Sequence, residues 1–132
     1  MEVLLPDGWS RPVGYANGVA AHGRLVFVAG QVGWDAEGRF ADGLVPQVSQ
    51  ALRNVVAVLR AGGAEPRHLV RLTWYVTDRE AYRASRADIG RAYREVIGAH
   101  YPTMTLVQVA ALLENAALVE IEATAVIPEA DA

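Results

Sequence analysis

The sequence predicts a single α+β domain in which one mixed, largely antiparallel sheet carries two helices on one face. The chain has 132 residues, which is the length of one domain. Hydrophobic residues make up 52% and charged residues 20%, the balance of an ordinary globular protein. The periodicity of the apolar residues gives the element order β-β-α-β-α-β-β. Residues 1–132 are therefore expected to form one domain, with loose ends at 1–11 and 128–132.

The first two predicted strands, residues 13–21 and 25–31, are expected to form a hairpin. Between them lies the sequence His22-Gly23-Arg24, a turn with glycine between two β-rich runs. The second strand is apolar on both faces, as is typical of a strand buried on both sides. Residues 33–43 contain turn residues without periodicity and are expected to form a loop.

The first predicted helix spans residues 44–61. Its apolar residues recur at spacings of three and four and form one stripe, made of Val45, Val48, Leu52, Val55 and Leu59. Proline is tolerated in a first helical turn, where Pro46 lies, and Gly62-Gly63 ends the helix.

The second half of the chain contributes a strand, a helix and two further strands. Residues 70–76 alternate between apolar and polar residues, the period of a strand with unlike faces. Thr77 or Asp78 can cap a helix that runs to about Ile97, with Glu80 in the position of a capping box. The last strands are expected at 103–110 and 118–127, joined by a loop around residues 114–115.

The helices can cover only one face of this sheet. Strands such as 25–29 and 118–127 carry apolar residues at both parities, so the other face would be apolar and uncovered in a monomer. A contiguous apolar face usually marks a subunit interface, and the pattern therefore predicts a homo-oligomer.

Composition excludes several classes of chemistry. The chain has no cysteine, which excludes disulfides, thiolate metal sites and cysteine nucleophiles. All twelve basic residues are arginine, which excludes Schiff-base lysines and the lysine of a phosphate-binding loop. The net charge of −3 gives no general attraction to nucleic acid or to an anionic membrane. No signal or membrane-spanning pattern is present, so a cytoplasmic protein is expected.

Most single candidates for a catalytic or binding role have a simpler interpretation. His22, His68 and His100 fall in turns and loops, where histidines are mostly solvated, and none has a partner at metal-ligand spacing. In the second helix, four arginines share one arc, namely Arg79, Arg83, Arg86 and Arg94. An RNA-binding stripe would look like this, but so would a solvated helix face in an acidic protein.

Two carboxylates in the last strand are less ordinary. Glu120 and Glu122 lie on the same face of a strand, where carboxylates are unfavourable unless they are paired or exposed. An exposed strand face would explain them. The alternative is a carboxylate in an oligomer cleft that activates water or accepts a proton from a substrate.

Four stretches together resemble the RidA/YjgF family, the endoribonuclease L-PSP-like reactive intermediate deaminases, over nearly the whole chain. Residues 13–19 are similar to the family's first strand with its tyrosine, and residues 28–31 are similar to its Ser-Gly-Gln motif. The other two stretches are residues 54–63, which end in a double glycine, and residues 119–123 with Ala125. Their order and spacing make the resemblance specific.

The resemblance implies a chorismate-mutase-like homotrimer with a small-molecule pocket in each intersubunit cleft. Family enzymes are hydrolases that convert enamines and imines to carbonyl products and ammonia, without a metal or cofactor. The resemblance assigns the catalytic role to Glu120. It places the substrate-binding positions at Tyr15, Gly30, Gln31, Gly90, Thr103 and Met104. No nucleic-acid or membrane partner is expected.

The sequence departs from the family at the position that binds the substrate carboxylate. The family has an arginine in a Pro-Ala-Arg motif, and its guanidinium clamps the carboxylate through two parallel hydrogen bonds. Here the motif reads Pro102-Thr103-Met104. The family's helix asparagine aligns with Gly90, and the serine before Gly30 is Ala29. Loss of the arginine predicts altered specificity, unless another arginine such as Arg11 takes its place.

Three functions are consistent with this pattern. The first is an imine or enamine deaminase in which Glu120 orients water or transfers a proton and Tyr15 closes the pocket. The second is a non-catalytic relative whose cleft binds an apolar or aromatic small molecule beside Met104 and Tyr15, with Trp74 expected in the core. The third is a ribonuclease or translation inhibitor, which the acidic charge and the absence of an aromatic RNA-stacking motif disfavour.

Overall fold

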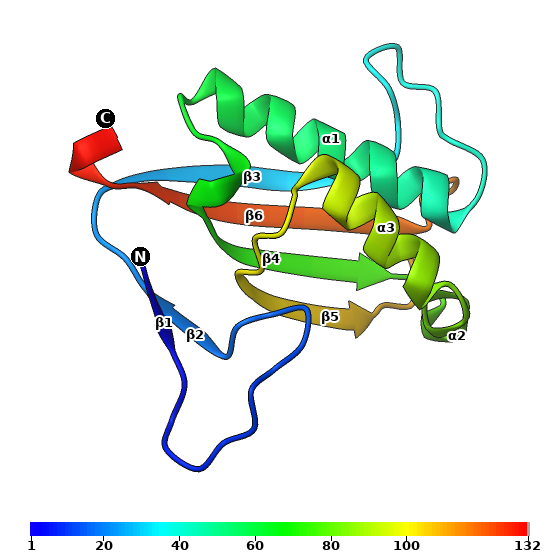
Figure 1. Cartoon of the computed structure of the whole chain (residues 1–132). Coiled ribbons are helices and arrows are strands. Elements are labelled where there is room, and N and C mark those ends of the chain that lie inside the picture. The colour runs from blue at the N-terminus through cyan, green and yellow to red at the C-terminus, as the bar shows by residue number, and fades with distance from the viewer. Residues whose placement is uncertain (132) are drawn as a thin grey trace.

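A computed structural model describes residues 1–131, and it confirms the α+β class with a mixed sheet and its helices on one face. Figure 1 shows α1 and α3 crossing the same side of the main sheet, which has the strand order β3-β6-β4-β5. The elements are β1 (Glu2–Leu4), β2 (Gly18–Ala20), β3 (Arg24–Val32), α1 (Leu44–Ala61), η1 (Pro66–His68), β4 (Leu69–Val76), α2 (Arg79–Ala84), α3 (Arg86–Val96), β5 (Thr103–Gln108), β6 (Val119–Ile127) and η2 (Glu129–Asp131).

The sheet is mixed because it contains both antiparallel and parallel pairs of strands. β6 pairs antiparallel with both β3 and β4, whereas β4 pairs parallel with β5. Parallel neighbours need a crossover connection, and α2 and α3 supply it between β4 and β5. The crossover therefore places α3 directly beside the β5 edge of the sheet (Figure 1).

The first helix begins and ends where the sequence predicts. Its stripe of apolar residues is buried, with Val48, Leu52, Val55 and Leu59 all fully inaccessible to solvent. Gly62 follows the helix and its N–H donates to the last carbonyls, so the double glycine acts as the predicted stop. Burial of this stripe fixes α1 across the sheet.

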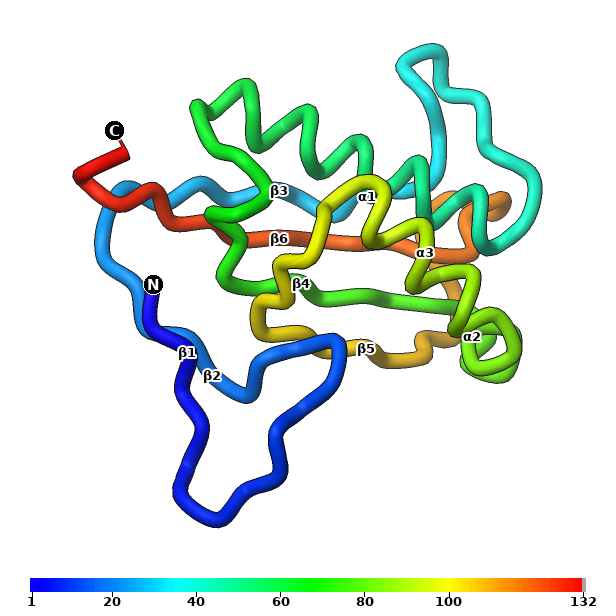
Figure 2. Tube along the Cα trace, in the orientation of Figure 1, coloured from blue at the N-terminus to red at the C-terminus, as the bar shows by residue number. Residues whose placement is uncertain are grey.

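The second predicted helix is wrong in one respect, because the structure divides it at Ser85. Asp78 caps α2, its carboxylate accepting hydrogen bonds from the backbone N–H groups of Glu80 and Ala81. Ser85 then leaves helical geometry, with φ −109° and ψ 14°, and α3 begins at Arg86. Figure 2 shows the trace of α2 nearly end-on beside the trace of α3, so the chain changes direction at this point. The break lets Ile89 and Tyr93 face the core.

The N-terminal third also differs from the prediction. Only Gly18–Ala20 of the predicted strand 13–21 is extended in a ladder, and it pairs with β1 rather than with β3. The end 1–11, expected to be loose, contains β1. Gly14 has a φ of +81°, which interrupts an extended strand, and β3 pairs instead with the longer β6. At the other end, residues 129–131 form a 3₁₀ turn, and Ala132 lies outside the described residues.

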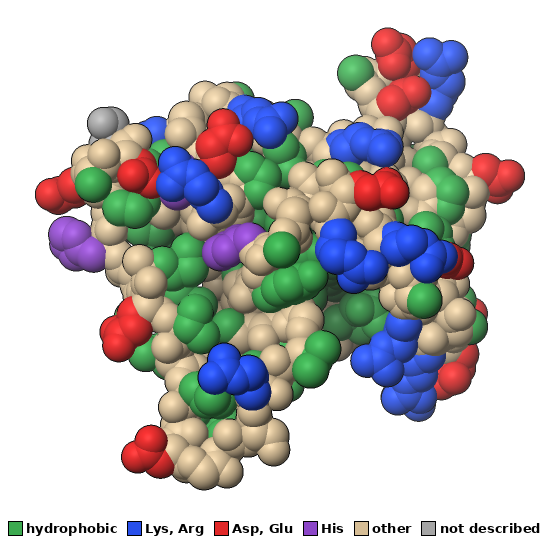
Figure 3. All heavy atoms as spheres, viewed as in Figure 1, with side chains coloured by type: hydrophobic (Ala, Val, Ile, Leu, Met, Phe, Trp, Pro, Cys, Tyr) green, Lys and Arg blue, Asp and Glu red, His purple; other side chains and the backbone are tan. Residues whose placement is uncertain are grey.

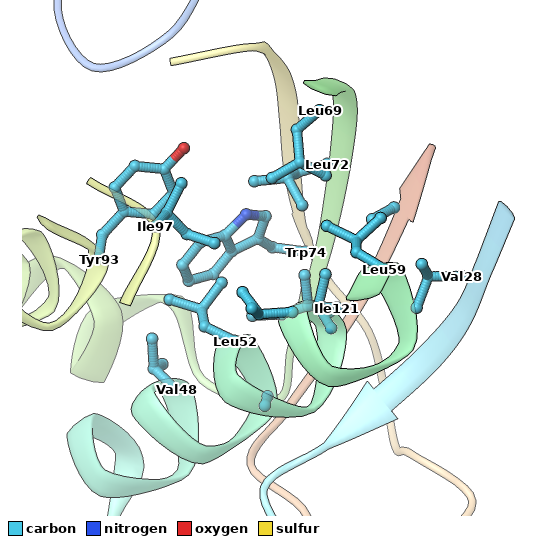
Figure 4. Packing of buried hydrophobic residues seen from close by; sticks show 14 of the residues in the cluster. Val28, Val48, Leu52, Leu59, Leu69, Leu72, Trp74, Tyr93, Ile97 and Ile121 are labelled. Carbon is cyan, nitrogen blue, oxygen red and sulfur yellow. The ribbon is translucent and has the colours of Figure 1, made fainter. Parts of the chain in front are cut away.

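The hydrophobic core lies between the sheet and the helices. Figure 4 shows Trp74 in its centre, between Tyr93 and Ile97 on one side and Leu52 and Ile121 on the other. Trp74 is only 2% exposed, so its predicted core position is confirmed. Within residues 1–131, no helix combines the length and apolarity needed to cross a bilayer.

The opposite face of the sheet carries no helix and is less apolar than predicted. Leu25 and Phe27 on β3 are exposed, Phe27 by 71%, and Val107 on β5 is 41% exposed. Of the two strands between them, β6 turns its apolar residues toward the helices and presents Glu120 and Glu122 on the open face. The open face is therefore apolar toward its edges and carboxylate-bearing in its middle.

Candidate functional site

A cavity of about 540 Å³ lies beside the β5 edge, enclosed by α3, the strands β4 and β5, and the segment 13–15. Its volume is typical of sites for small molecules. Figure 3 shows a hollow floored by hydrophobic side chains, with basic side chains gathered beside it. Three of the predicted substrate-binding residues line this cavity: Tyr15, Gly90 and Met104.

The backbone explains how Tyr15 reaches Met104 although 89 positions of sequence numbering separate them. The N–H of Ala16 donates to the carbonyl of Pro102 at 3.0 Å, and Ala16 forms a parallel bridge with Thr103. These contacts hold the segment 13–17 against the start of β5. Met104 pairs with the buried Leu72 in the β4–β5 ladder and points to the helix side of the sheet.

Five aromatic residues line the cavity: Tyr15, Trp74, Tyr82, Tyr93 and Tyr101. Tyr93 and Tyr101 are stacked with ring centroids 5.5 Å apart, and Trp74 meets Tyr82 edge-on at 6.3 Å. Burial raises the pKa of Tyr82 and Tyr93, so both phenols stay protonated near neutral pH. The Tyr93 hydroxyl donates to the carbonyl of His100 at 2.6 Å, which fixes the ring. The wall is therefore rigid, apolar and neutral.

Two arginines, Arg86 and Arg94, complete the cavity; the sequence analysis placed them in a four-arginine arc and did not assign them to the small-molecule site. Arg86 and Arg94 lie one helical turn on either side of Gly90 on the cavity-facing side of α3. In the predicted arc of four arginines, Arg79 and Arg83 instead pair with Glu80. The spacing of Arg86, Gly90 and Arg94 at i, i+4 and i+8 was the signal that could have distinguished them.

The remaining predicted residues form a second group on the β3–β6 ladder. A bulge between Val28 and Gln31 places Gly30 against Glu120, so closely that a Cβ on Gly30 would lie 2.0 Å from the Glu120 Oε2 atom. Gln31 Nε2 donates to the carbonyl of Ala29 at 3.2 Å. The bulge therefore makes a niche for the Glu120 carboxylate that only glycine permits.

The neighbouring carboxylate, Glu122, is engaged within the chain. It accepts a hydrogen bond of 2.6 Å from the hydroxyl of Tyr75, and this contact raises the pKa of the tyrosine. Glu120 makes no side-chain hydrogen bond within residues 1–131. Of the two carboxylates, Glu122 is therefore hydrogen-bonded within the chain, whereas Glu120, to which the resemblance assigns the catalytic role, has no such side-chain partner within residues 1–131.

The two groups do not meet within one chain. β3 and β5 are the opposite edges of the sheet, and Met104 faces the helices whereas Glu120 faces the open side. Thr103, another predicted substrate-binding residue, belongs to neither group. Its hydroxyl donates to the carbonyl of Val70 at 2.6 Å and ties β5 to β4. Within residues 1–131, none of Gly30, Gln31 and Glu120 lines the cavity beside β5.

The expectation that the histidines are solvated is wrong for His68, which is 4% exposed. Its Nδ1 accepts from the N–H of Glu65 at 2.9 Å, and its Nε2 lies 3.0 Å from Asp131 Oδ2. His100 Nε2 contacts the carbonyl of Leu69 at 2.7 Å. Both histidines hold loops in place. Among residues 1–131, no three His, Cys, Asp or Glu residues are grouped to hold a metal ion.

Comparison with known proteins places this arrangement in a family. The endoribonuclease L-PSP family profile matches residues 10–127. The chain belongs to the RidA/YjgF family. A RutC family protein of Pyrococcus horikoshii is 31% identical over 127 residues, which cover 94% of this chain and 96% of that protein.

Two further RidA/YjgF relatives bear on fold and activity. A Rid family protein of unknown function from Yersinia pestis has a crystal structure that superposes with a TM-score of 0.84 at 35% identity, covering 96% of this chain and 98% of that chain. The 2-iminobutanoate/2-iminopropanoate deaminase of Capra hircus is 32% identical over 105 residues, or 78% of this chain and 73% of that protein.

Proposed function

We propose that this RidA/YjgF chain is a hydrolase that converts imines or enamines to carbonyl products and ammonia, in clefts between the subunits of a homotrimer. The observation that carries the proposal is the division of the site. The β5 edge of the sheet supplies an apolar cavity with Tyr15 and Met104, and the open face supplies an unengaged carboxylate, Glu120 on β6. A deaminase-named relative that matches 78% of the chain supports the reaction class.

Strand geometry explains why a second subunit is needed. β3 and β5 are separated by three strand spacings, about 14 Å in all. Gly30 lies on β3, and Glu120 lies on β6, two spacings from β5, with its side chain on the open face. A small molecule in the cavity on the helix side of β5 therefore cannot also touch Gly30 and Glu120 of the same chain. If the open face of one copy packs beside the β5 edge of another, the two halves meet, and the exposed Leu25 and Phe27 are covered at the same time.

In this cleft the chemistry is a hydrolysis with water as the only co-reactant. Water attacks the imine carbon and its oxygen forms the new bond to carbon, while Glu120 accepts the proton that the water loses. The carboxyl group returns this proton to the nitrogen, which gives an amino alcohol. The hydroxyl proton of the amino alcohol then passes to the amino nitrogen, the carbon–nitrogen bond breaks, and ammonia leaves a carbonyl product. An enamine enters the same sequence once its carbon is protonated. We assign to Tyr15, which lines the cavity, the role of shielding the bound substrate from bulk water.

Methionine at position 104 changes which substrates fit. A guanidinium at this strand position would hold a carboxylate at the cavity floor, and Met104 offers a polarizable, uncharged surface there instead. We therefore expect weak binding of short 2-imino acids, which depend on a charged anchor. Specificity in this chain must come from the rest of the cavity.

The test is ammonia release from a panel of freshly generated imines and enamines. Release that falls at least about 100-fold in Glu120→Gln supports the proposal, since general base catalysis typically contributes about 10²- to 10⁴-fold. Unchanged release in that variant would refute the role of Glu120. Light scattering should give three subunits per particle, and a monomer at micromolar concentration would refute the shared cleft.

A second candidate function, a non-catalytic binding protein, is favoured by the rigid aromatic wall of the cavity. Such a wall suits tight binding of an apolar molecule without any reaction. Ligands that raise the unfolding midpoint, combined with no ammonia release from any member of the panel, would select this function.

A further inference from the structure

We propose that the cavity beside β5 binds an aromatic carboxylate, with its ring against the tyrosine and tryptophan wall and its carboxylate on Arg86 and Arg94. As a statement about substrates, the inference rests on the proposed deaminase function. It narrows the substrates of that deaminase to 2-imino acids with an aryl side chain. The ligand class itself is argued only from the cavity.

The first argument is the concentration of aromatic rings. Four of the five tyrosines of the chain line this one cavity, together with Trp74. Rings pair favourably with other rings at centroid separations of about 4.5 to 7 Å, beyond the benefit of area burial. The stacked Tyr93 and Tyr101 and the edge of Tyr82 offer such positions, and Met104 adds a thioether that also favours aromatic contacts.

The second argument is unbalanced positive charge. Within residues 1–131, Arg86 and Arg94 have no carboxylate within ion-pair distance, whereas Arg79, Arg83 and Arg91 on the same two helices all have one. A Cβ on Gly90 would lie 3.5 Å from Arg94 Nη1, so the Arg94 guanidinium lies over the space beside the glycine. Gly90 therefore leaves room between two cations, where a carboxylate can accept hydrogen bonds from both.

The third argument is a donor without an acceptor. The Trp74 indole N–H is buried with no hydrogen-bond partner in residues 1–131, although the residue lines the cavity. A buried donor left unpaired is unfavourable, by about 1 to 3 kcal/mol in general. A polar atom of a ligand that reaches this N–H would supply the missing acceptor.

Titration calorimetry with stable ligands tests the ligand class without turnover. One pair, 3-phenyl-2-oxopropanoate and 2-oxobutanoate, differs in the aryl group, and a second pair, 3-phenylpropanoate and 3-phenylpropanamide, differs in the charge. We expect the aryl carboxylate of each pair to bind at least about tenfold more tightly, the loss typical of one charged hydrogen bond or of a buried ring.

The variants Arg86→Gln and Arg94→Gln should each weaken binding of 3-phenylpropanoate by about tenfold or more. Their matched control is Arg91→Gln, because Arg91 lies on the same helix but pairs with Asp88 and does not line the cavity. All three side chains are exposed, so the fold should persist, and circular dichroism checks it. Equal binding of acid and amide, or equal losses in all three variants, would overturn the proposal.

The outcomes separate this inference from the proposed function. Discrimination between the ligands without ammonia release would leave the ligand class standing and refute the deaminase. Ammonia release from short 2-imino acids, together with equal binding of both members of each pair, would do the reverse.

Discussion

The close approach of Gly30 to Glu120 offers a direct test of the proposed catalytic carboxylate. Replacing Gly30 by alanine would put a Cβ 2.0 Å from Glu120 Oε2 and 2.8 Å from its Cδ, and ordinary contact begins only at 3.4 Å. The carboxylate must therefore move back by about 1.4 Å, a displacement of the size that costs roughly 100-fold when it misplaces a catalytic group. The perturbation acts on Glu120 without changing its charge.

The stability of Gly30→Ala should change little. The colliding atoms, Oε2, Cδ and Cγ of Glu120, all belong to one flexible side chain, and an altered rotamer costs about 0.5 to 1.5 kcal/mol. The alanine also reduces the entropy of the unfolded chain, which offsets about 0.4 to 1 kcal/mol. We expect the free energy of unfolding, measured in urea, to stay within about 1 kcal/mol of wild type. A loss of activity would then reflect displacement of the carboxylate.

The assay is ammonia release from the best substrate. A double-mutant cycle compares the effect of Gly30→Ala in the presence and in the absence of the Glu120 carboxylate. Gly30→Ala should lower kcat/KM about 100-fold in the wild-type background but have little further effect when Glu120 is already alanine. Gly18→Ala is the matched control, because a Cβ there would meet only the side chain of Leu4. Equal losses in both backgrounds would show that Gly30 acts through its own backbone, and unchanged activity of the single variant would refute the catalytic role of Glu120.

Four further predictions concern specificity and stability. Met104→Arg should raise kcat/KM for short 2-imino acids by about tenfold or more, measured as ammonia release. Leu52→Ala should lower the free energy of unfolding in urea by about 2 to 5 kcal/mol, since Leu52 is fully buried. Gly90→Ala should raise it by about 0.5 to 1 kcal/mol, because a Cβ there meets nothing closer than 3.5 Å. Hydrogen bonds from His68 and Arg67 lower the pKa of Asp131, so its contribution is complete above its ordinary pKa of 3.8 and is lost as the pH falls below it. Acid unfolding of Asp131→Asn should therefore show a smaller loss of stability below about pH 4 than the wild type shows.

The elements that the sequence predicted well are those whose burial repeats at a fixed period. The stripe of α1 and the alternation in β4 each bury one face of the element, and the spacing of the buried apolar residues matches the period of that element. Glu120 and Glu122 were placed correctly on one strand face for the same reason. Periodicity, however, does not say which strands are neighbours, and the predicted hairpin of β2 and β3 failed because β6 is the longer partner.

The candidate site could be predicted only in part, for a related reason. The resemblance named Tyr15, Gly90 and Met104 as one group, and the cavity brings these three together. Arg86 and Arg94 were not assigned to the site, because a sequence does not distinguish an arginine that faces a cavity from one that faces water. The structure distinguishes them, since neighbouring arginines such as Arg83 form ion pairs. The cavity also depends on the break between α2 and α3 at Ser85, which orients α3. The sequence around Ser85 contains no local pattern that predicts this break.

The place of the cation decides which end of a ligand enters first. An arginine at position 104 would hold a carboxylate at the floor on β5, and the side chain of the ligand would then point toward α3. With Met104 at the floor and the exposed side chains of Arg86 and Arg94 on the cavity-facing side of α3, the apolar end enters first and the carboxylate stays near the mouth. The reactive carbon of a 2-imino acid is bonded to that carboxylate and therefore also lies near the mouth. This is the part of the cavity that Glu120 of a second copy could reach. Methionine in place of the floor arginine is therefore compatible with hydrolysis, provided that the side chain of the ligand fills the aromatic interior.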